Sequence, residues 1–334
     1  MLPLSVLDLS PVTTATPASQ ALRNSLDLAR HADALGYRRY WVAEHHNLAN
    51  IASSAPDIMI GQIAAVTRNM RVGSGGVMLP NHAPLTVLER FKVLEALFPG
   101  RIDLGLGRAP GTDQVTSIAL RRRQGANEND DFLERLQEML LFENQGFPAE
   151  HPFSKVRAMP TDVALPPIFL LGSSDYSARL SASAGMGFSF AHHFADFDPV
   201  LAMRIYRDNF KPGSLDRPYA ILALAAVAAD TDAEADRLAT TIDLNFARRA
   251  KGDYLPLESP EAAAAYDYSP ADRARIARNR ERLFVGSPAT IVDRLRPLIE
   301  ATQADEIMIT TMIFDHEARR HSYTLLARAF AEAG

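Results

Sequence analysis

The sequence predicts an α/β fold, and within that class a (β/α)₈ (TIM) barrel. Apolar segments of strand length alternate with segments of helical period along all 334 residues. Eight strands can be assigned in this way, which is the number that such a barrel needs. The length is large for one domain but typical of barrels that carry insertions. The alternation of strands and helices implies a parallel sheet. We favour a sheet closed into a barrel, forming one domain over residues 1–334. A doubly wound open sheet is the alternative, and periodicity alone does not distinguish the two.

The first half of the chain contains four predicted strands and the three helices between them. The strands are 4–9, 40–43, 70–78 and 102–106, and the helices are 20–35, 57–67 and 84–98. Gly36 and the Pro99-Gly100 pair are stop signals for two of the helices, and Pro56 introduces the third.

The second half repeats the pattern with longer interruptions. The strands are 168–171, 187–191, 219–227 and 306–311, and the helices are 131–142, 177–184, 199–209, 232–249, 290–301 and 316–332. Insertions are expected near strand four (110–129) and near strands seven and eight (250–284). The segment 250–284 mixes a run of alanines with three prolines and fits neither a strand nor one helix. We expect it to lie over one end of the barrel.

Composition excludes several classes of function. The net charge of −5 provides no basic field for a nucleic-acid partner. The absence of cysteine excludes disulfides, thiolate nucleophiles and cysteine-ligated metals, and we expect no metal site. The longest apolar run, 220–229, is far shorter than the roughly 20 residues of a membrane helix. The first residues have no signal-peptide pattern, and a cytoplasmic location is expected.

Two neighbouring histidines, His45 and His46, follow the second strand, where barrel enzymes place functional groups. Because side chains alternate along a strand, these two point to opposite sides and form a poor metal pair. We expect one to face the cavity while the other packs or caps. A purely structural role remains open for either one.

Two segments could bind a phosphate. Arg108 follows the fourth strand in a glycine-rich turn, and its guanidinium is suited to phosphate, although a structural turn is nearly as good an interpretation. After the fifth strand, Gly172-Ser173-Ser174 opens a predicted helix, whose first amides form a natural anion site unless the serines merely cap it. Both segments lie at the same face of a barrel, which favours a phosphorylated cofactor.

Glycine is unusually frequent in the third strand, at Gly73, Gly75 and Gly76. Because glycine weakens a strand, its frequency here must have a cause. The cause is either the close approach of a flat ligand to the backbone or a β-bulge. Asp8 on the first strand is either an inward polar group or a buried structural carboxylate, and the sequence leaves both open.

The chain resembles the bacterial-luciferase-like family of flavin-dependent monooxygenases, in its single-chain, alkanal-monooxygenase-like branch. The resemblance covers almost the whole length. It rests on four segments: 40–46 (YWVAEHH), 71–80 (RVGSGGVMLP), 99–108 (PGRIDLGLGR) and 285–288 (VGSP). It implies a (β/α)₈ barrel that binds reduced FMN, with 250–284 as a lid.

The resemblance also implies roles for individual residues. Arg108 and the adjacent Ala109 would bind the FMN phosphate together with Gly172, Ser173 and Ser174. His45, with His46 beside it, matches the catalytic histidine position. The Gly75-Gly76 bond matches a non-prolyl cis peptide that lies against the flavin ring. The chain departs from the luciferases at Gly172, where they have an acidic residue, and in having no reactive cysteine.

The function implied by the resemblance is oxygenation of a small organic substrate. A separate NAD(P)H:flavin reductase would supply reduced FMN, and O₂ would react to form a flavin C4a-peroxide. A homodimer is implied, with the helices after strands two and three as its interface. The alternatives are an F420-dependent hydride-transfer enzyme and a non-catalytic flavin-binding paralogue.

Overall fold

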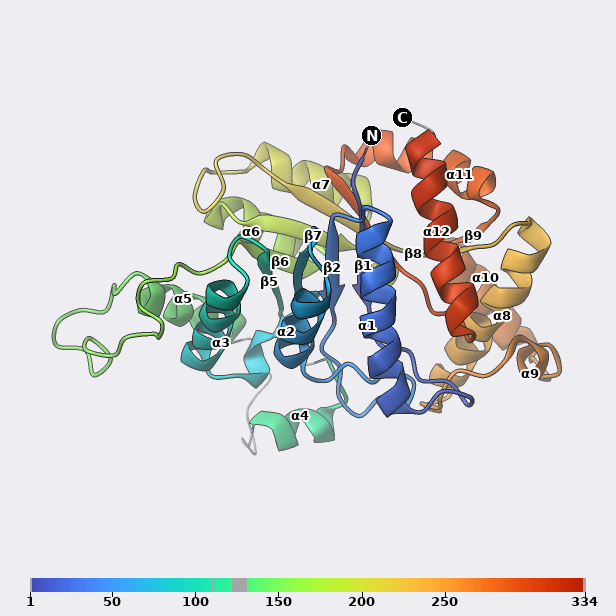
Figure 1. Cartoon of the computed structure of the whole chain (residues 1–334), viewed down its shortest axis with the longest axis horizontal. Helices are drawn as coiled ribbons and strands as arrows, with labels where there is room; N and C mark the ends of the chain where they lie inside the picture. The colour runs from blue at the N-terminus through green and yellow to red at the C-terminus, as the bar shows by residue number, and fades with distance from the viewer. Residues whose placement is uncertain (1, 110, 122–130, 333–334) are drawn as a thin grey trace.

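The computed structural model describes residues 2–109, 111–121 and 131–332. Its strands pair in parallel and close into a barrel, because β8 pairs with both β7 and β10, and β10 pairs with β1 (Figure 1). The strands are β1 (Leu4–Asp8), β2 (Arg39–Val42), β3 (Arg71–Ser74), β4 (Val77–Met78), β5 (Ile102–Gly107), β6 (Ile168–Gly172), β7 (Gly187–Ala191), β8 (Ala220–Ala228), β9 (Leu283–Gly286) and β10 (Glu306–Thr310). The predicted (β/α)₈ barrel is confirmed, and the closed pairing rules out the open sheet.

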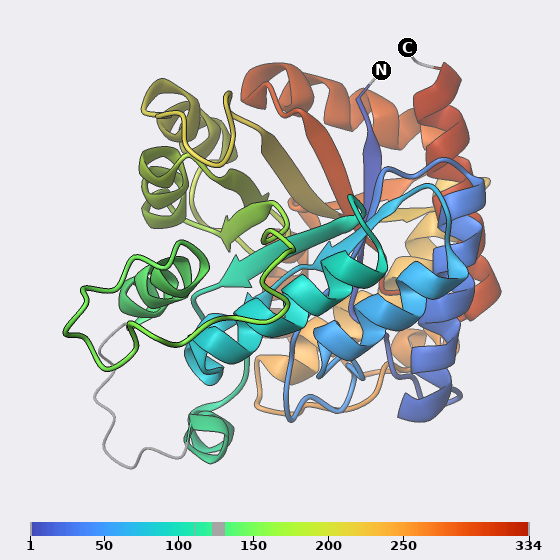
Figure 2. The same cartoon turned by 60° about the vertical axis from the view of Figure 1, so that its left-hand side comes forward.

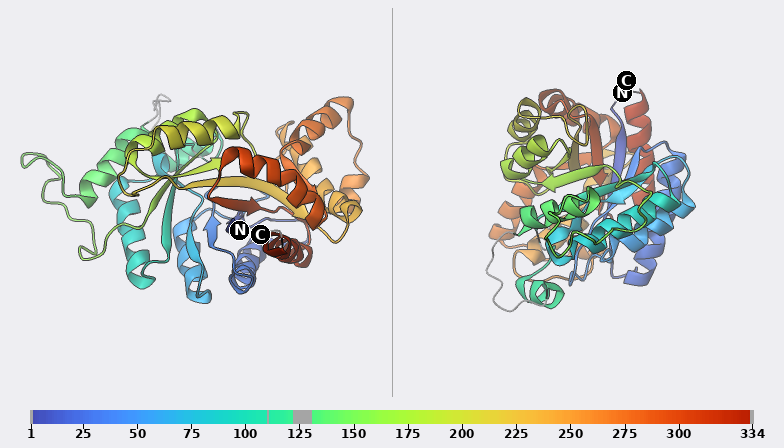
Figure 3. Two further views of the ribbon diagram at one scale, coloured as in Figure 1. Left: turned by 90° about the horizontal axis from the view of Figure 1, so that it is seen from above. Right: turned by 90° about the vertical axis from the view of Figure 1, so that its left-hand side faces the viewer.

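Helices surround the barrel and return the chain from the end of each strand to the start of the next. They are α1 (Ala18–Ala34), α2 (Pro56–Val66), α3 (Pro84–Leu97), α4 (Gln114–Arg121), α5 (Phe132–Glu143), α6 (Asp175–Ala184), α7 (Pro199–Asp208), α8 (Asp232–Arg249), α9 (Pro260–Ala264), α10 (Pro270–Arg280), α11 (Pro288–Thr302) and α12 (His316–Glu332), with a 3₁₀ turn η1 (Leu79–Asn81). The start of β1 and the end of α12 lie side by side, as the two views of Figure 3 show. Figure 2 shows α5 beside α3 on one flank of the barrel.

Both faces of the strands are buried, as a parallel sheet requires. Outward residues such as Val6 and Val72 pack against the helices in the larger core. Inward residues such as Leu7, Trp41 and Phe169 form a second, smaller core inside the barrel. The alternation of side chains along each strand therefore separates a helix-facing layer from the barrel interior.

A buried ionic network closes the barrel interior at the end where the strands begin. Arg39 donates to Glu306 Oε2 at 2.9 Å and to Asp103 Oδ2 at 2.7 Å. Trp41 Nε1 donates to the same Asp103 oxygen at 3.1 Å. This paired and hydrogen-bonded network satisfies charges that would be costly to bury alone.

The structure differs from the sequence prediction at the third strand and in the insertion 250–284. The predicted strand 70–78 is divided into β3 and β4 at Gly75-Gly76. The last residues of 250–284 belong to β9, a strand that was missed and that pairs with the end of β8. The rest of that segment contains α9 and α10, and of the loop 110–129 the residues 114–121 form α4, while 110 and 122–129 lie outside the described residues.

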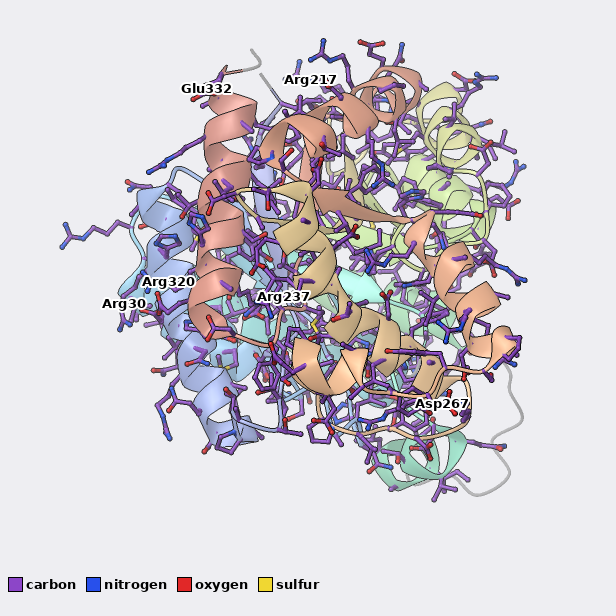
Figure 4. The ribbon with its side chains drawn as sticks, turned by 90° about the vertical axis from the view of Figure 1, so that its right-hand side faces the viewer. Arg30, Arg217, Arg237, Asp267, Arg320 and Glu332 are labelled. Atoms are coloured by element: carbon purple, nitrogen blue, oxygen red, sulfur yellow. The ribbon has the colours of Figure 1, made fainter. Side chains whose placement is uncertain are left out.

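The segment 250–284 packs on α8 through ion pairs. Arg280 contacts Asp243 at 2.7 Å and Asp236 at 3.1 Å, both on α8. Arg237 of α8 contacts Glu261 of α9 at 2.9 Å. Figure 4 shows this flank, with Arg237 labelled on α8.

Within the described part of the chain, no helix has the length and apolar character that crossing a membrane requires.

Candidate functional site

A cavity of about 540 Å³ opens at the end of the barrel where the strands terminate. Each of the strands β1, β2, β3, β5, β6, β7 and β10 contributes to its wall at or near its last residue. The longer β8 contributes Ala223 and Ala225, and α8 forms one side. The segment 250–284 adds Leu257, Asn279 and Arg282. This volume is in the range of small-molecule sites, roughly 300–1,000 Å³.

One wall of the cavity is suited to an anion. Arg108 follows β5, and its guanidinium carbon lies 4.3 Å from the centroid of the Tyr176 ring in the first turn of α6. Ser173 and Ser174 line the same cavity, as does Ala109. Ser174 is the N-cap residue of α6, but its side chain accepts no hydrogen bond from a helix amide. The structure thus brings the predicted phosphate residues together at a helix N-terminus, where amides and dipole favour negative charge.

Gly172 also lines the cavity, through its backbone. A Cβ atom at this position would overlap Ser177 Oγ in α6. The glycine therefore lets the first turn of α6 pack tightly on the end of β6. Any side chain here, including the acidic one of the luciferases, would need Ser177 to move.

The Gly75-Gly76 bond lies between β3 and β4 and is a non-prolyl cis peptide, as the resemblance implied. Both glycines line the cavity. A Cβ atom on Gly75 would lie 2.5 Å from Leu7 Cδ1 and 3.1 Å from the Cβ of Trp41, and one on Gly76 would lie 2.7 Å from the Gly105 carbonyl oxygen. Neighbouring strands therefore leave no space for side chains at either position, and the cavity has a flat backbone wall there.

The two histidines after β2 point in different directions, as strand alternation predicts. His45 lines the cavity, and its buried Nδ1 has no hydrogen-bond partner. His46 Nε2 lies 2.9 Å from Glu44 Oε1, and His46 is not among the residues that line the cavity. Of the two proposed catalytic histidines, the structure places only His45 at the site.

Burial, together with the nearby charge of Arg249, lowers the pKa of His45 from 6.5 to about 4, while Glu44 acts in the opposite direction. Burial also lowers the pKa of His193 to about 4. His193 lines the same cavity, with Nδ1 3.3 Å from the Ala223 carbonyl oxygen. Both imidazoles are therefore neutral at pH 7, and each can donate one hydrogen bond and accept another.

The sequence profile of the luciferase-like monooxygenases matches residues 2–334. The chain belongs to this family. It is 43% identical over 322 residues to the luciferase-like monooxygenase of Escherichia coli K12, covering 96% of this chain and 95% of the relative. It is 35% identical over 335 residues to the N-acetyl-S-alkylcysteine monooxygenase of Bacillus subtilis, covering 100% of this chain and 99% of the relative. The chain is therefore an enzyme of the monooxygenase class, which argues against a non-catalytic paralogue.

Several solved structures have the same fold. Apo-MsnO8 is similar with a TM-score of 0.89 at 37% identity, covering 99% of both chains. The oxygenating constituent of the 3,6-diketocamphane monooxygenase of Pseudomonas putida, solved in complex with FMN, has a TM-score of 0.73 at 19% identity, covering 99% of this chain and 98% of that one. An F420-dependent secondary alcohol dehydrogenase has a TM-score of 0.71 at 11% identity, covering 98% of both chains. The last two likenesses establish the fold alone.

One residue of this luciferase-like monooxygenase that the sequence analysis did not select is Glu44, which lies behind the cavity wall. Its carboxylate contacts His46 Nε2 and His82 Nε2, each at 2.9 Å, and accepts the Met78 amide at 2.8 Å. Burial would raise the pKa of Glu44, but these hydrogen bonds outweigh burial and lower it. Glu44 thus fixes β4 just after the cis peptide.

Asp8 is a structural carboxylate rather than a site residue of the luciferase-like monooxygenase. It is fully buried and accepts from Arg319 at 2.7 Å and from the Tyr40 hydroxyl at 2.5 Å. Its neighbours on the strand, Leu7 and Leu9, line the cavity, so Asp8 points outward to α12. Of the two roles that the sequence left open for Asp8, this orientation supports the buried structural carboxylate.

Among the described residues, the group with the geometry of metal ligands is Asp27, His316 and Glu317, on the outside of the barrel. Arg320 contacts Asp27 at 3.3 Å and Glu317 at 3.0 Å. A guanidinium already compensates these carboxylates, so the cluster is an ion-pair network between α1 and α12.

Proposed function

We propose that this luciferase-like monooxygenase uses reduced FMN and O₂ to oxygenate a small organic substrate. The observation that carries the proposal is the convergence on one cavity of Arg108, the N-terminus of α6, the Gly75-Gly76 cis peptide and His45. A phosphate-binding end, a flat backbone wall and a neutral imidazole are what a flavin-dependent oxygenation requires of the protein.

The described residues fit FMN at both ends of the cofactor. Arg108 and the hydroxyls of Ser173 and Ser174 would bind its phosphate, with the first amides of α6. The Gly75-Gly76 bond would lie against the flavin ring, because no side chain stands between this backbone and the cavity. The unpartnered Nδ1 of His45 provides a polar contact that a ligand in the cavity would satisfy.

Bound reduced FMN supplies the two electrons and the reactive atom at which O₂ is activated. The protein would position the cofactor and the substrate, exclude water from the cavity and transfer protons. Leu7, Leu9 and Met308 present apolar surface to the cavity, which limits the access of water. His45 is neutral at pH 7 and can accept a proton at Nδ1 or donate a hydrogen bond, depending on its tautomer.

We propose that a separate NAD(P)H:flavin reductase supplies the reduced FMN and that the enzyme works in the cytoplasm, where NAD(P)H is available. The segment 250–284 would act as a lid, since Leu257, Asn279 and Arg282 already line the cavity. The 35% identical N-acetyl-S-alkylcysteine monooxygenase makes a thioether one candidate substrate class.

We further propose a homodimer through α2 and α3. Ile58 on α2 and Leu97 on α3 are each 66% exposed, and Val93 lies one turn before Leu97 with 47% exposed. Exposed large apolar side chains on two adjacent helices are typical of a protein interface.

The test is an anaerobic titration of the purified protein with reduced FMN, oxidised FMN and F420. Trp41 is the only tryptophan and lies beside Gly75, so its fluorescence reports ring binding. We expect selective binding of reduced FMN, weakened about tenfold or more in Arg108→Ala because a charge-assisted contact is lost. Arg179→Ala, on the exposed side of α6, is the matched control and should bind as the wild type does.

Turnover is then measured with O₂ on a panel of thioethers and straight-chain aldehydes. His45→Asn should keep reduced-FMN binding but lower product formation. Selective binding of F420 without oxygen consumption would replace this proposal by hydride transfer. Binding of neither cofactor would refute both.

A further inference from the structure

The charged side chains of the cavity all have the same sign. Arg108, Arg249 and Arg282 line it, and no aspartate or glutamate occurs among the described lining residues. The chain as a whole has 40 acidic and 35 basic residues, so this imbalance runs against its composition. A cavity lined by one sign of charge concentrates ligands of the opposite sign.

The three arginines differ in how far the protein compensates them. Arg108 belongs to the phosphate end described above. Arg282 donates to the Ala195 carbonyl oxygen at 2.6 Å and to Asp196 Oδ1 at 2.9 Å. Arg249 makes no ion pair with any described residue, and its guanidinium carbon lies 5.8 Å from the centroid of the Tyr254 ring. Within the described part of the chain, Arg249 is therefore a cation of this site that lacks a counter-charge.

Arg249 lies in the last turn of α8, where a cation also interacts favourably with the helix dipole. That role alone does not account for its position. Arg248 occupies the same turn, pairs with Glu258 at 3.3 Å and does not line the cavity. In the last turn of α8, Arg248 thus forms an ion pair with a carboxylate, whereas Arg249 lines the cavity.

The surroundings of Arg249 form a small binding surface on α8. Asn245 lies one turn earlier on the same face of the helix and also lines the cavity. Its Oδ1 accepts from Asn50 Nδ2 at 3.4 Å, which leaves its amide NH₂ for a ligand. Ile242 and Phe246 add apolar surface beside these two polar groups.

We propose that Arg249 and Asn245 bind a carboxylate of the substrate, and that the substrate class is a small organic acid with an apolar body. This inference rests on the proposed function, because Arg108 is assigned to the cofactor and α8 to the substrate. A carboxylate accepts two parallel hydrogen bonds from a guanidinium, and the apolar residues of α8 contact the rest of the molecule.

Substrate binding would also act on His45. The charge of Arg249 contributes to lowering the His45 pKa. A carboxylate bound at Arg249 offsets that charge and raises the His45 pKa toward its ordinary value. Occupancy of the α8 site is thereby linked to the proton affinity of the histidine in the cavity.

The experiment compares hexanoate with hexanamide, which has nearly the same shape and no charge, by isothermal titration calorimetry at pH 7.5. We expect the wild type to prefer hexanoate about tenfold, as one charge-assisted contact allows. Arg249→Gln should abolish the preference, while Arg249→Lys keeps part of it. Arg204→Gln, an exposed arginine of α7 away from the cavity, is the control for the lost charge and should behave as the wild type.

Arg108→Gln separates the two anion-binding ends. The preference should persist in this variant, and its loss there, or its persistence in Arg249→Gln, would overturn the assignment of the carboxylate to α8. Reduced-FMN titrations on the same proteins separate this inference from the proposed function. Wild type that binds reduced FMN without preferring hexanoate refutes the α8 site alone. An Arg249-dependent preference without FMN binding refutes the proposed function and supports the anion site.

Discussion

Replacing His45 by glutamine should make the stability of the protein less sensitive to acid. Burial, assisted by the charge of Arg249, lowers the pKa of His45 from 6.5 to about 4 in the folded state. Between these two values the unfolded chain binds a proton on this imidazole that the folded chain does not bind. The free energy of unfolding therefore falls as the pH falls through this range, and the loss is complete once both states are protonated.

The magnitude follows from the two pKa values. Each pH unit within the range changes the free energy of unfolding by about 1.4 kcal/mol for one such group. Because the transition is only partial near the ordinary pKa, the loss attributable to His45 between pH 7 and pH 5 is about 2 kcal/mol. His193, whose pKa burial also lowers to about 4, should contribute a loss of similar size.

The assay is urea unfolding followed by the fluorescence of Trp41, which is fully buried in the barrel interior. Wild type, His45→Gln and the control His321→Gln are compared at pH 7, 6 and 5. His321 is an exposed histidine of α12 that pairs with Asp230. The wild type and the control should each lose about 2 kcal/mol more than His45→Gln between pH 7 and pH 5. Equal losses in all three proteins would refute the assignment of a buried, neutral imidazole to His45.

Three further predictions concern packing and assembly. Gly172→Ala should destabilise the fold by about 1–3 kcal/mol, because the new Cβ overlaps Ser177 Oγ, and adding Ser177→Gly should recover part of that loss in urea unfolding. No recovery would count against the overlap as the cause. Arg319→Met should cost about 3–5 kcal/mol at pH 7, because it leaves the buried Asp8 carboxylate without its cation, and Asp8→Asn in the same chain should reduce the cost. Identical stabilities of the single and double variants would contradict this pairing. If the proposed homodimer forms through α3, Leu97→Asp should convert it into a monomer in analytical ultracentrifugation, and a wild type that sediments as a monomer would show that α3 is not an interface.

The barrel could be predicted from the sequence because each strand is short, apolar and separated from the next by a helical period. The division of the third strand could not be predicted from that pattern. Val72, Val77 and Met78 are apolar and fit one continuous strand. The apolar pattern of a strand does not reveal whether the Gly75-Gly76 peptide bond is cis or trans. Only the resemblance to a family predicted the cis bond, which the structure contains.

The residues of the proposed cofactor end of the cavity could be predicted for a related reason. Arg108 and Ser173 follow their strands directly in the sequence, so their place at the rim follows from the fold class alone. Glu44 also follows a strand, but its importance depends on partners as distant as His82 and Met78, which only the tertiary structure brings together. No local pattern distinguishes such a carboxylate from a solvated one.

Arg249 lay beyond sequence analysis because it belongs to a helix rather than to the end of a strand. Its position depends on the unusual length of β8. The last partner of β10 on β8 is Ala225, and Ala226–Ala228 continue beyond it to pair with β9, adding about 10 Å of strand. α8 begins four residues after this extension, and its second half, from Ile242 to Arg249, lines one side of the cavity. The proposed phosphate end is built on β5 and α6, whereas the proposed carboxylate end is built on α8, which follows the β8 extension. A substitution in α8 can therefore change the charge preference for substrate while Arg108 and the cis peptide stay in place.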